Sequence, residues 1–320
     1  MNPSSSPLSI GQCATLACLL EVTAPKPGNV HRAADFPDLH FADFLTSATA
    51  IGPVFERAHP DAVGITIRDS IKATRSLVNT NTNLGIVLLL APLACVPRSQ
   101  ILATGIDAIL EKLSAQDAQF VYEAIQVAQP GGMGEVSEHD IRGAAPESLL
   151  DAMEAAKERD MIARQYVNRF ADVFAAVEHL LMPVLACGGS LFDAIVWTHL
   201  GFLAHSGDSL IERKRGTEAN QKAQAMARKV IDAGPRELQR ACGSFLEGSR
   251  DTVQPITQTQ TSSLEWSSTY WQYRADLDFW MRSDLGRNPG TTADLVTATV
   301  FCVLREQRVS PPFRWHPATP

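Results

Sequence analysis

A short segment near the N-terminus combines Glu21, Lys26 and Gly28 with two prolines, and His40 and Asp43 follow soon after. Each proline fixes φ at about −65° and disfavours helix for the residue before it. Gly28 can adopt a left-handed conformation or let a ligand approach the backbone. This stiff turn should place Glu21 at the end of one helix, and His40 and Asp43 near the start of the next helix. Such a group could bind a metal-bound nucleotide, or could be a plain connection with solvated charges.

A second polar segment, residues 79–83, directly precedes the most apolar stretch of the chain and includes Asn81, Thr82 and Asn83. Asparagine and threonine are good helix N-caps, but one helix needs only one cap. Amide and hydroxyl groups at a helix N-terminus also form a site for phosphate or carboxylate. The segment therefore predicts a ligand-binding turn in addition to a cap.

A third segment is a glycine-rich turn that contains Gly132 and Gly134 and is followed by Glu135. Glycines permit close backbone approach to a ligand, and a carboxylate there could reach Mg²⁺ through its oxygens. The spacing matches neither the dinucleotide-binding nor the P-loop pattern, so both of those folds are excluded.

Two later segments complete the set of candidates. Asp208 is followed by Arg213, the first of three consecutive basic residues, which could pair with phosphate or could be a solvated face. Asp294 lies near the start of the last predicted helix, where an acid could stabilise the helix dipole by under ~1 kcal/mol or could bind a ligand.

Apolar residues recur with helical spacing along nearly the whole chain, and alternating strand patterns are absent. We therefore predict an all-α fold: a single compact multi-helix domain over residues 9–307, with its ligand site formed by turns between helices. Residues 1–8 and 308–320 are predicted to be tails. The predicted helices are approximately 10–20, 41–51, 63–79, 83–95, 99–112, 116–128, 166–185, 191–205, 217–232, 235–248, 262–283 and 291–306.

Composition narrows the class of protein. The 320-residue chain has a net charge of −7, which argues against a nucleic-acid partner because such proteins usually carry a basic patch. Its six cysteines are scattered without a CxxC pair, which favours buried free thiols in a reducing compartment. The N-terminus lacks a signal-peptide pattern, and the apolar stretch 84–96 is shorter than the ~20 residues of a membrane span. We expect a cytoplasmic protein that binds neither nucleic acid nor membrane.

Together and in this order, the segments resemble the triphosphoribosyl-dephospho-CoA synthase family. The resemblance spans about residues 10 to 305 and is most specific in the first two segments. The matched motifs are the PKPG loop (25–28) with its preceding acid Glu21, the downstream His40 and Asp43, the GxxGE turn (131–135) and the Pro-Gly-x-x-Ala-Asp segment (289–294). The family's Asn-Thr-His-x-Gly turn appears here as Asn-Thr-Asn-Leu-Gly (81–85).

The resemblance implies a transferase that joins ATP and 3′-dephospho-CoA and releases adenine. A ribose hydroxyl attacks the anomeric carbon of ATP through an oxocarbenium-like transition state, which needs a carboxylate base, cations for the triphosphate and exclusion of water. Mg²⁺ accompanies ATP, the partners are small-molecule nucleotides, and the chain could act as a homodimer. By analogy, the catalytic and metal-binding acids are Glu21, Asp43 and Glu135. The implied substrate- and phosphate-binding residues are Lys26, Gly28, His40, Asn81, Thr82, Asn83, Gly132, Gly134, Asp208, Arg213 and Asp294.

Two of the matched motifs depart from the family pattern. Asn83-Leu84 stands where the family commonly has His-Lys or His-Arg, and Met133 stands where it often has Arg. Each lost charge-assisted phosphate contact could cost about 1.5–3 kcal/mol. Either Arg142 or Arg213 substitutes, or the ligand carries less charge. The alternatives are a divergent relative with another phosphorylated acceptor such as a pterin, a non-catalytic nucleotide-binding homologue, and a purely structural helical protein without a polar pocket.

Overall fold

The computed structural model describes residues 7–129, 146–248, 264–313 and 315. Within these ranges the regular structure is helical, and β-type pairing is limited to two isolated bridges, His31–Ala34 and Phe36–Leu39. The predicted all-α class is confirmed. The helices are α1 (Ile10–Thr23), α2 (Phe41–Phe55), α3 (Val63–Arg75), α4 (Leu84–Cys95), α5 (Leu102–Leu110), α6 (Ala115–Ala128), α7 (Leu149–Ala156), α8 (Met161–Val167), α9 (Ala171–Ala176), the π-helix η1 (Val177–Leu181), α10 (Met182–Ala186), α11 (Leu191–Ser206), α12 (Ser209–Asp232), α13 (Arg236–Leu246), α14 (Ser268–Arg282), the 3-10 helix η2 (Leu285–Arg287) and α15 (Gly290–Arg305).

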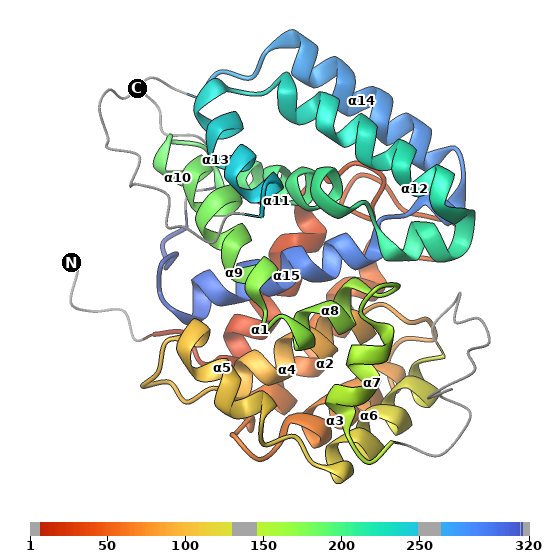
Figure 1. Ribbon diagram of the computed structural model, residues 1–320, viewed down its shortest axis with the longest axis vertical. Helices are drawn as coiled ribbons and strands as arrows, with labels where there is room; N and C mark the ends of the chain where they lie inside the picture. Colours follow the sequence, from red (N-terminus) through yellow and green to blue (C-terminus); the bar gives the residue numbers. More distant parts are fainter. Residues whose placement is uncertain (1–6, 130–145, 249–263, 314, 316–320) are drawn as a thin grey trace.

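Helix α15 crosses the middle of the molecule, with α2 to α8 on one side of it and α10 to α14 on the other (Figure 1). It packs against α1, α4, α9 and α11, so elements from both halves of the chain meet along it. Because α15 is buried along nearly its whole length, its first turns are held firmly inside the protein.

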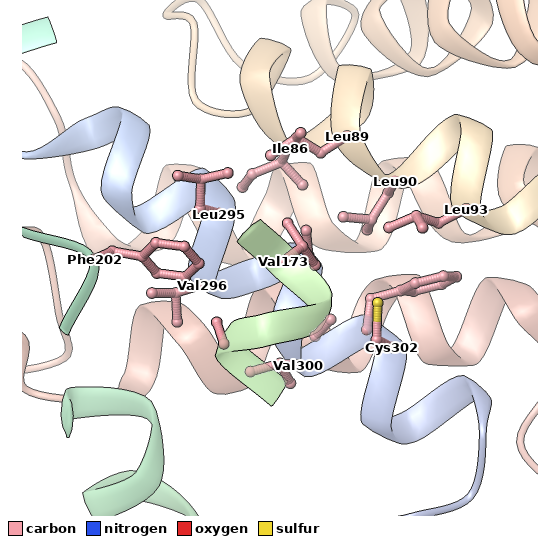
Figure 2. Close-up of a cluster of buried hydrophobic side chains, with 14 of the residues drawn as sticks. Ile86, Leu89, Leu90, Leu93, Val173, Phe202, Leu295, Val296, Val300 and Cys302 are labelled. Carbon is pink, nitrogen blue, oxygen red and sulfur yellow. The ribbon is translucent and has the colours of Figure 1, made fainter. Parts of the chain in front are cut away.

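The core around α4 and α15 is built mainly from aliphatic side chains (Figure 2). Leu89 and Leu90 of α4 and Val296 and Val300 of α15 are fully buried. Helix α4 is apolar around its whole circumference, as expected for a helix covered on all sides. This packing fixes the N-terminal turns of both helices relative to each other, and the polar residues of the site lie at those turns.

Pro92 lies inside α4, where it cannot donate the hydrogen bond that the carbonyl of Leu88 would otherwise accept. The buried hydroxyl of Tyr166 donates to that carbonyl instead, at 2.7 Å. The helix therefore continues through the proline, because a side chain from α8 replaces the missing donor.

Most predicted helices are confirmed to within a few residues, but the single helix predicted over 166–185 is wrong. Arg169 and Phe170 adopt φ values of 61° and 62°, which interrupt the helix, and a π-helix and Pro183 follow. The turn buries the ring of Phe170 beside Tyr166, with ring centroids 5.8 Å apart, so tertiary packing overrides the local helical pattern. Helix α7 was not predicted. Helix α12 starts earlier than expected and bends at Gly216, whose φ is 80°.

All six cysteines are free, and five of them are buried, as the sequence predicts. Across the described ranges, no helix combines the length and apolarity needed to cross a bilayer.

Candidate active site

The proline loop has the predicted left-handed glycine. Gly28 has a φ of 71°, and its N–H donates to Asp278 Oδ1 at 2.7 Å. A Cβ at this position would overlap the side chain of Met281. The loop is therefore packed against α14, and only glycine fits at its turn.

Lys26 lies inside this loop, and its side chain is fully buried. Its Nζ is 2.9 Å from Oε1 of Glu21, which is also buried, and it donates to the main-chain carbonyls of Glu21, Ala24 and Val30 at 2.6, 3.3 and 3.4 Å. Burial raises the pKa of Glu21 and lowers that of Lys26, and their mutual attraction opposes both shifts. In this geometry Lys26 fixes Glu21 and closes the loop, and a phosphate contact by Lys26 stays a prediction.

Glu21 borders a small cavity between α1, α2 and α4. The cavity has a volume of about 10 Å³, roughly the space of one water molecule. Its lining is Cys18, Glu21, Phe44, Ser47, Ala48, Thr82, Asn83 and Ile86.

The two asparagines of the second segment have different environments. Asn81 Oδ1 accepts from the N–H of Leu84 at 3.1 Å and so caps α4. Asn83 is buried, and its Nδ2 donates to Thr74 Oγ1 at 2.8 Å. Asn83 Oδ1 is buried without a hydrogen-bond partner. Buried acceptors are normally paired, so this atom points to a missing donor.

Asp294, near the start of α15, lies against Gly85 in the first turn of α4. A Cβ on Gly85 would overlap the Asp294 carboxyl, so the close approach of these helices requires glycine. Burial, reinforced by the charges of Glu21 and Asp208, raises the pKa of Asp294 well above its ordinary value, and Arg213 opposes the shift. Asp294 is thus held in its protonated form over a wider pH range than an ordinary carboxyl group.

Asp208 joins the starts of two helices. Its Oδ1 accepts from the N–H groups of Leu210 and Ile211 at 2.9 and 3.1 Å, which caps α12. Its Oδ2 accepts from the N–H of Thr292 in α15 at 2.7 Å. Arg213, one turn into α12, donates to Asp160 Oδ2 at 3.0 Å. Asp208 therefore ties the start of α12 to the start of α15, and Arg213 ties α12 to the residue that caps α8.

Gly85→Ala should therefore lower activity much more than the same substitution at a glycine with open space around it. The new methyl group must displace the Asp294 carboxyl or push α4 away from α15, and misplacement of a reacting group by about 1 Å can cost on the order of 100-fold in rate. Steady-state kinetics with a melting curve would test this, with Gly243→Ala as the control because a Cβ at Gly243 has open space. Full activity in Gly85→Ala would show that the close contact is unimportant.

The structure brings several predicted site residues together: Glu21, Thr82 and Asn83 line one cavity, and Asp208, Arg213 and Asp294 are linked by the charge and hydrogen-bond contacts above. A purely structural protein without a polar pocket does not agree with this arrangement. Ser47 and Gly85 also belong to the site. Ser47 could have been found from its position one helical turn after Asp43, whereas the role of Gly85 depends on Asp294, far along the chain.

Other predicted residues lie elsewhere. Asp43 Oδ2 accepts from the N–H of His40 at 3.1 Å and caps α2. The ring of His40 is exposed, with Nδ1 3.7 Å from Asp35. Gly132, Gly134 and Glu135 lie outside the described residues.

The predicted magnesium ligands are Glu21, Asp43 and Glu135, of which Glu135 lies outside the described residues. In the part of the chain that the structure describes, no group of three or more His, Cys, Asp or Glu side chains is arranged to hold a metal ion. Mg²⁺ is often held mainly by substrate phosphates, with one or two carboxylates from the protein. The described residues therefore do not form a resident metal site.

The fold and the site define a class: an all-helical enzyme whose polar groups are held at helix ends around a buried pocket. The family model for ATP:dephospho-CoA triphosphoribosyl transferase matches residues 7–312, so the chain belongs to this family and is a transferase. Among solved structures, the chain is similar to a protein from Archaeoglobus fulgidus provisionally assigned as a triphosphoribosyl-dephospho-CoA synthase. The two share 23% identity over 85% of this chain and 99% of the other, with a TM-score of 0.58. No curated protein sequence matches the chain.

Proposed function

We propose that this chain carries out the family reaction, ATP plus 3′-dephospho-CoA to 2′-(5″-triphosphoribosyl)-3′-dephospho-CoA plus adenine, with Glu21 as the base and Asp294 as the acid. The observation that carries the assignment is the contrast between the two carboxyl groups. Glu21 is ion-paired with Lys26 at 2.9 Å. The charged groups that act on Asp294 are mostly carboxylates, and Arg213 is the cation among them. Two acids with different environments are the arrangement that acid–base chemistry needs.

The reaction forms one bond and breaks one bond. The 2′-oxygen of the acceptor ribose bonds to the anomeric carbon of ATP, and its proton passes to the Glu21 carboxylate. The bond between that carbon and the adenine nitrogen breaks, and the departing base takes the proton of Asp294. Burial raises the pKa of both groups, so Glu21 accepts a proton more readily than an ordinary carboxylate and Asp294 keeps its proton to higher pH before it donates.

Lys26 supports the base without touching substrate. Its contacts to three main-chain carbonyls hold the ammonium group in place, and the ion pair then fixes the Glu21 carboxylate. Arg213 supplies a cation on the α12 side of the site, where it can contribute to binding of the triphosphate. Mg²⁺ enters with ATP in this proposal. The buried free thiols fit the reducing conditions of the cytoplasm, where we place the reaction.

Incubation of the purified protein with ATP, Mg²⁺ and dephospho-CoA tests the proposal. We expect one equivalent of adenine for each dephospho-CoA consumed, and a product whose mass has increased by the triphosphoribosyl group. A reaction without dephospho-CoA controls for hydrolysis of ATP. Absence of adenine release across a range of metal ions would contradict the proposal.

A further inference from the structure

The hydroxyl groups in the cavity between α1, α2 and α4 have no proton left to offer a ligand. Ser47 Oγ donates to the carbonyl of Asp43 at 2.6 Å. It also lies 2.5 Å from Thr82 Oγ1, and this second bond needs a proton of its own. Because a hydroxyl group carries a single proton, Thr82 must be the donor to Ser47.

Among the other side chains that line the cavity, Cys18 has only a weak thiol donor, and Asn83 and Glu21 supply oxygen acceptors. Asn83 uses Nδ2 on Thr74, and its unpartnered Oδ1 is buried. Glu21 contributes a carboxylate. A ligand group that enters this cavity must therefore donate hydrogen bonds.

The size of the cavity limits that group further. A volume of about 10 Å³ holds one hydroxyl group or water molecule, whereas a phosphate has a central atom and four oxygens. The charge has the same effect, because the Glu21 carboxylate in the cavity wall would repel a phosphate. Unpaired acceptors and like charges discriminate against an unwanted ligand as strongly as good contacts select the right one.

From these features we infer that Asn83 Oδ1 accepts the free 3′-hydroxyl of the acceptor ribose beside Glu21, and that the cavity thereby excludes acceptors with a 3′-phosphate. This inference rests on the proposed function and adds the basis of its acceptor specificity. The 3′-hydroxyl is the group that enters the cavity and pairs with Asn83 Oδ1, a buried acceptor without a partner. The neighbouring 2′-hydroxyl, which reacts, stays outside the cavity and donates to the Glu21 carboxylate.

Three acceptors test the inference: dephospho-CoA, its 3′-deoxy analogue and CoA. For the unmodified protein we expect kcat/KM for dephospho-CoA to exceed that for the 3′-deoxy analogue by at least about tenfold, and CoA to be a still poorer acceptor. In Asn83→Ala the preference over the 3′-deoxy analogue should fall to within about twofold. Asn81→Ala is the matched control, since Asn81 caps α4 outside the cavity and its loss should keep the preference.

Calorimetry of the same acceptors without ATP gives a reading that does not depend on turnover. A preference for dephospho-CoA that disappears in Asn83→Ala supports the inference even if adenine release is not observed, in which case the proposed reaction alone fails. Adenine release with equal use of dephospho-CoA and its 3′-deoxy analogue overturns the inference and leaves the reaction standing. Efficient use of CoA also overturns the inference. It would indicate that the Asn83 amide is rotated by 180°, so that its NH₂ group donates to the 3′-phosphate of CoA.

Discussion

Asp294→Asn should remove most of the activity and at the same time raise the melting temperature at neutral pH. General acid catalysis typically contributes about 10²–10⁴-fold, and asparagine cannot supply the proton that adenine needs as it leaves. The substitution keeps the size and shape of the side chain beside Gly85, so the contact between α4 and α15 is preserved. Gains in stability on removal of an active-site group are common, because such groups are placed for function and not for stability.

The sign of the stability effect follows from the raised pKa of Asp294. The folded protein holds the Asp294 proton at pH values where the unfolded chain releases it. The folded state therefore loses stability relative to the unfolded chain as pH rises from the ordinary carboxyl pKa to the raised pKa of Asp294. Asparagine carries no charge, so the difference in melting temperature between variant and unmodified protein should be small at low pH and grow across this interval.

Asp284→Asn is the matched control with the opposite sign. Hydrogen bonds from Arg215 and from the N–H of Gly286 lower the pKa of Asp284 to about 2. This carboxylate stabilises the fold above the ordinary carboxyl pKa, and that contribution is lost as pH falls toward 2. Its replacement should lower the melting temperature at neutral pH and leave catalysis intact. If Asp294→Asn behaved like Asp284→Asn, Asp294 would not be the protonated acid.

The helices could be predicted from the sequence because their apolar periodicity is local, and α4 and α15 lie nearly where the pattern places them. The helix interruption at Phe170 could not be predicted, because the positive φ of this residue reflects the burial of its ring against Tyr166 of α8. Local patterns predict helices well where tertiary packing and propensity agree.

The candidate acids could also be named from the sequence, but which of them lie close together in space could not be predicted. Glu21 and Asp294 stand near opposite ends of the chain, and only the packing of α1 against α15 brings them together. Lys26 shows the same limit: a lysine between two prolines is compatible with a phosphate contact or with a buried ion pair. Its burial is set by distant residues around the loop, including His199, whose Nε2 lies 3.1 Å from the carbonyl of Pro27.

Lys26→Met is expected to destabilise the protein by about 3–5 kcal/mol, because it leaves the Glu21 carboxylate buried without a partner. Urea denaturation would measure the loss. Glu21→Gln combined with Lys26→Met should recover much of it, since replacing both members of a buried pair by neutral groups is often neutral. Lys157→Met is the control for removal of a lysine. Its pairing with Glu154 is at the surface, and such pairs contribute little.

The double variant also separates the two interpretations of Lys26. It should be folded but inactive, because the Glu21 carboxylate is absent, so its ATP affinity can be measured without turnover. If Lys26 acts only by holding Glu21, the affinity for Mg-ATP should stay within about twofold of that of Glu21→Gln alone. If Lys26 contacts a phosphate, the double variant should bind ATP at least about tenfold more weakly, since charge-assisted bonds contribute about 1.5–3 kcal/mol. The burial of Lys26 and its three carbonyl contacts favour the first result.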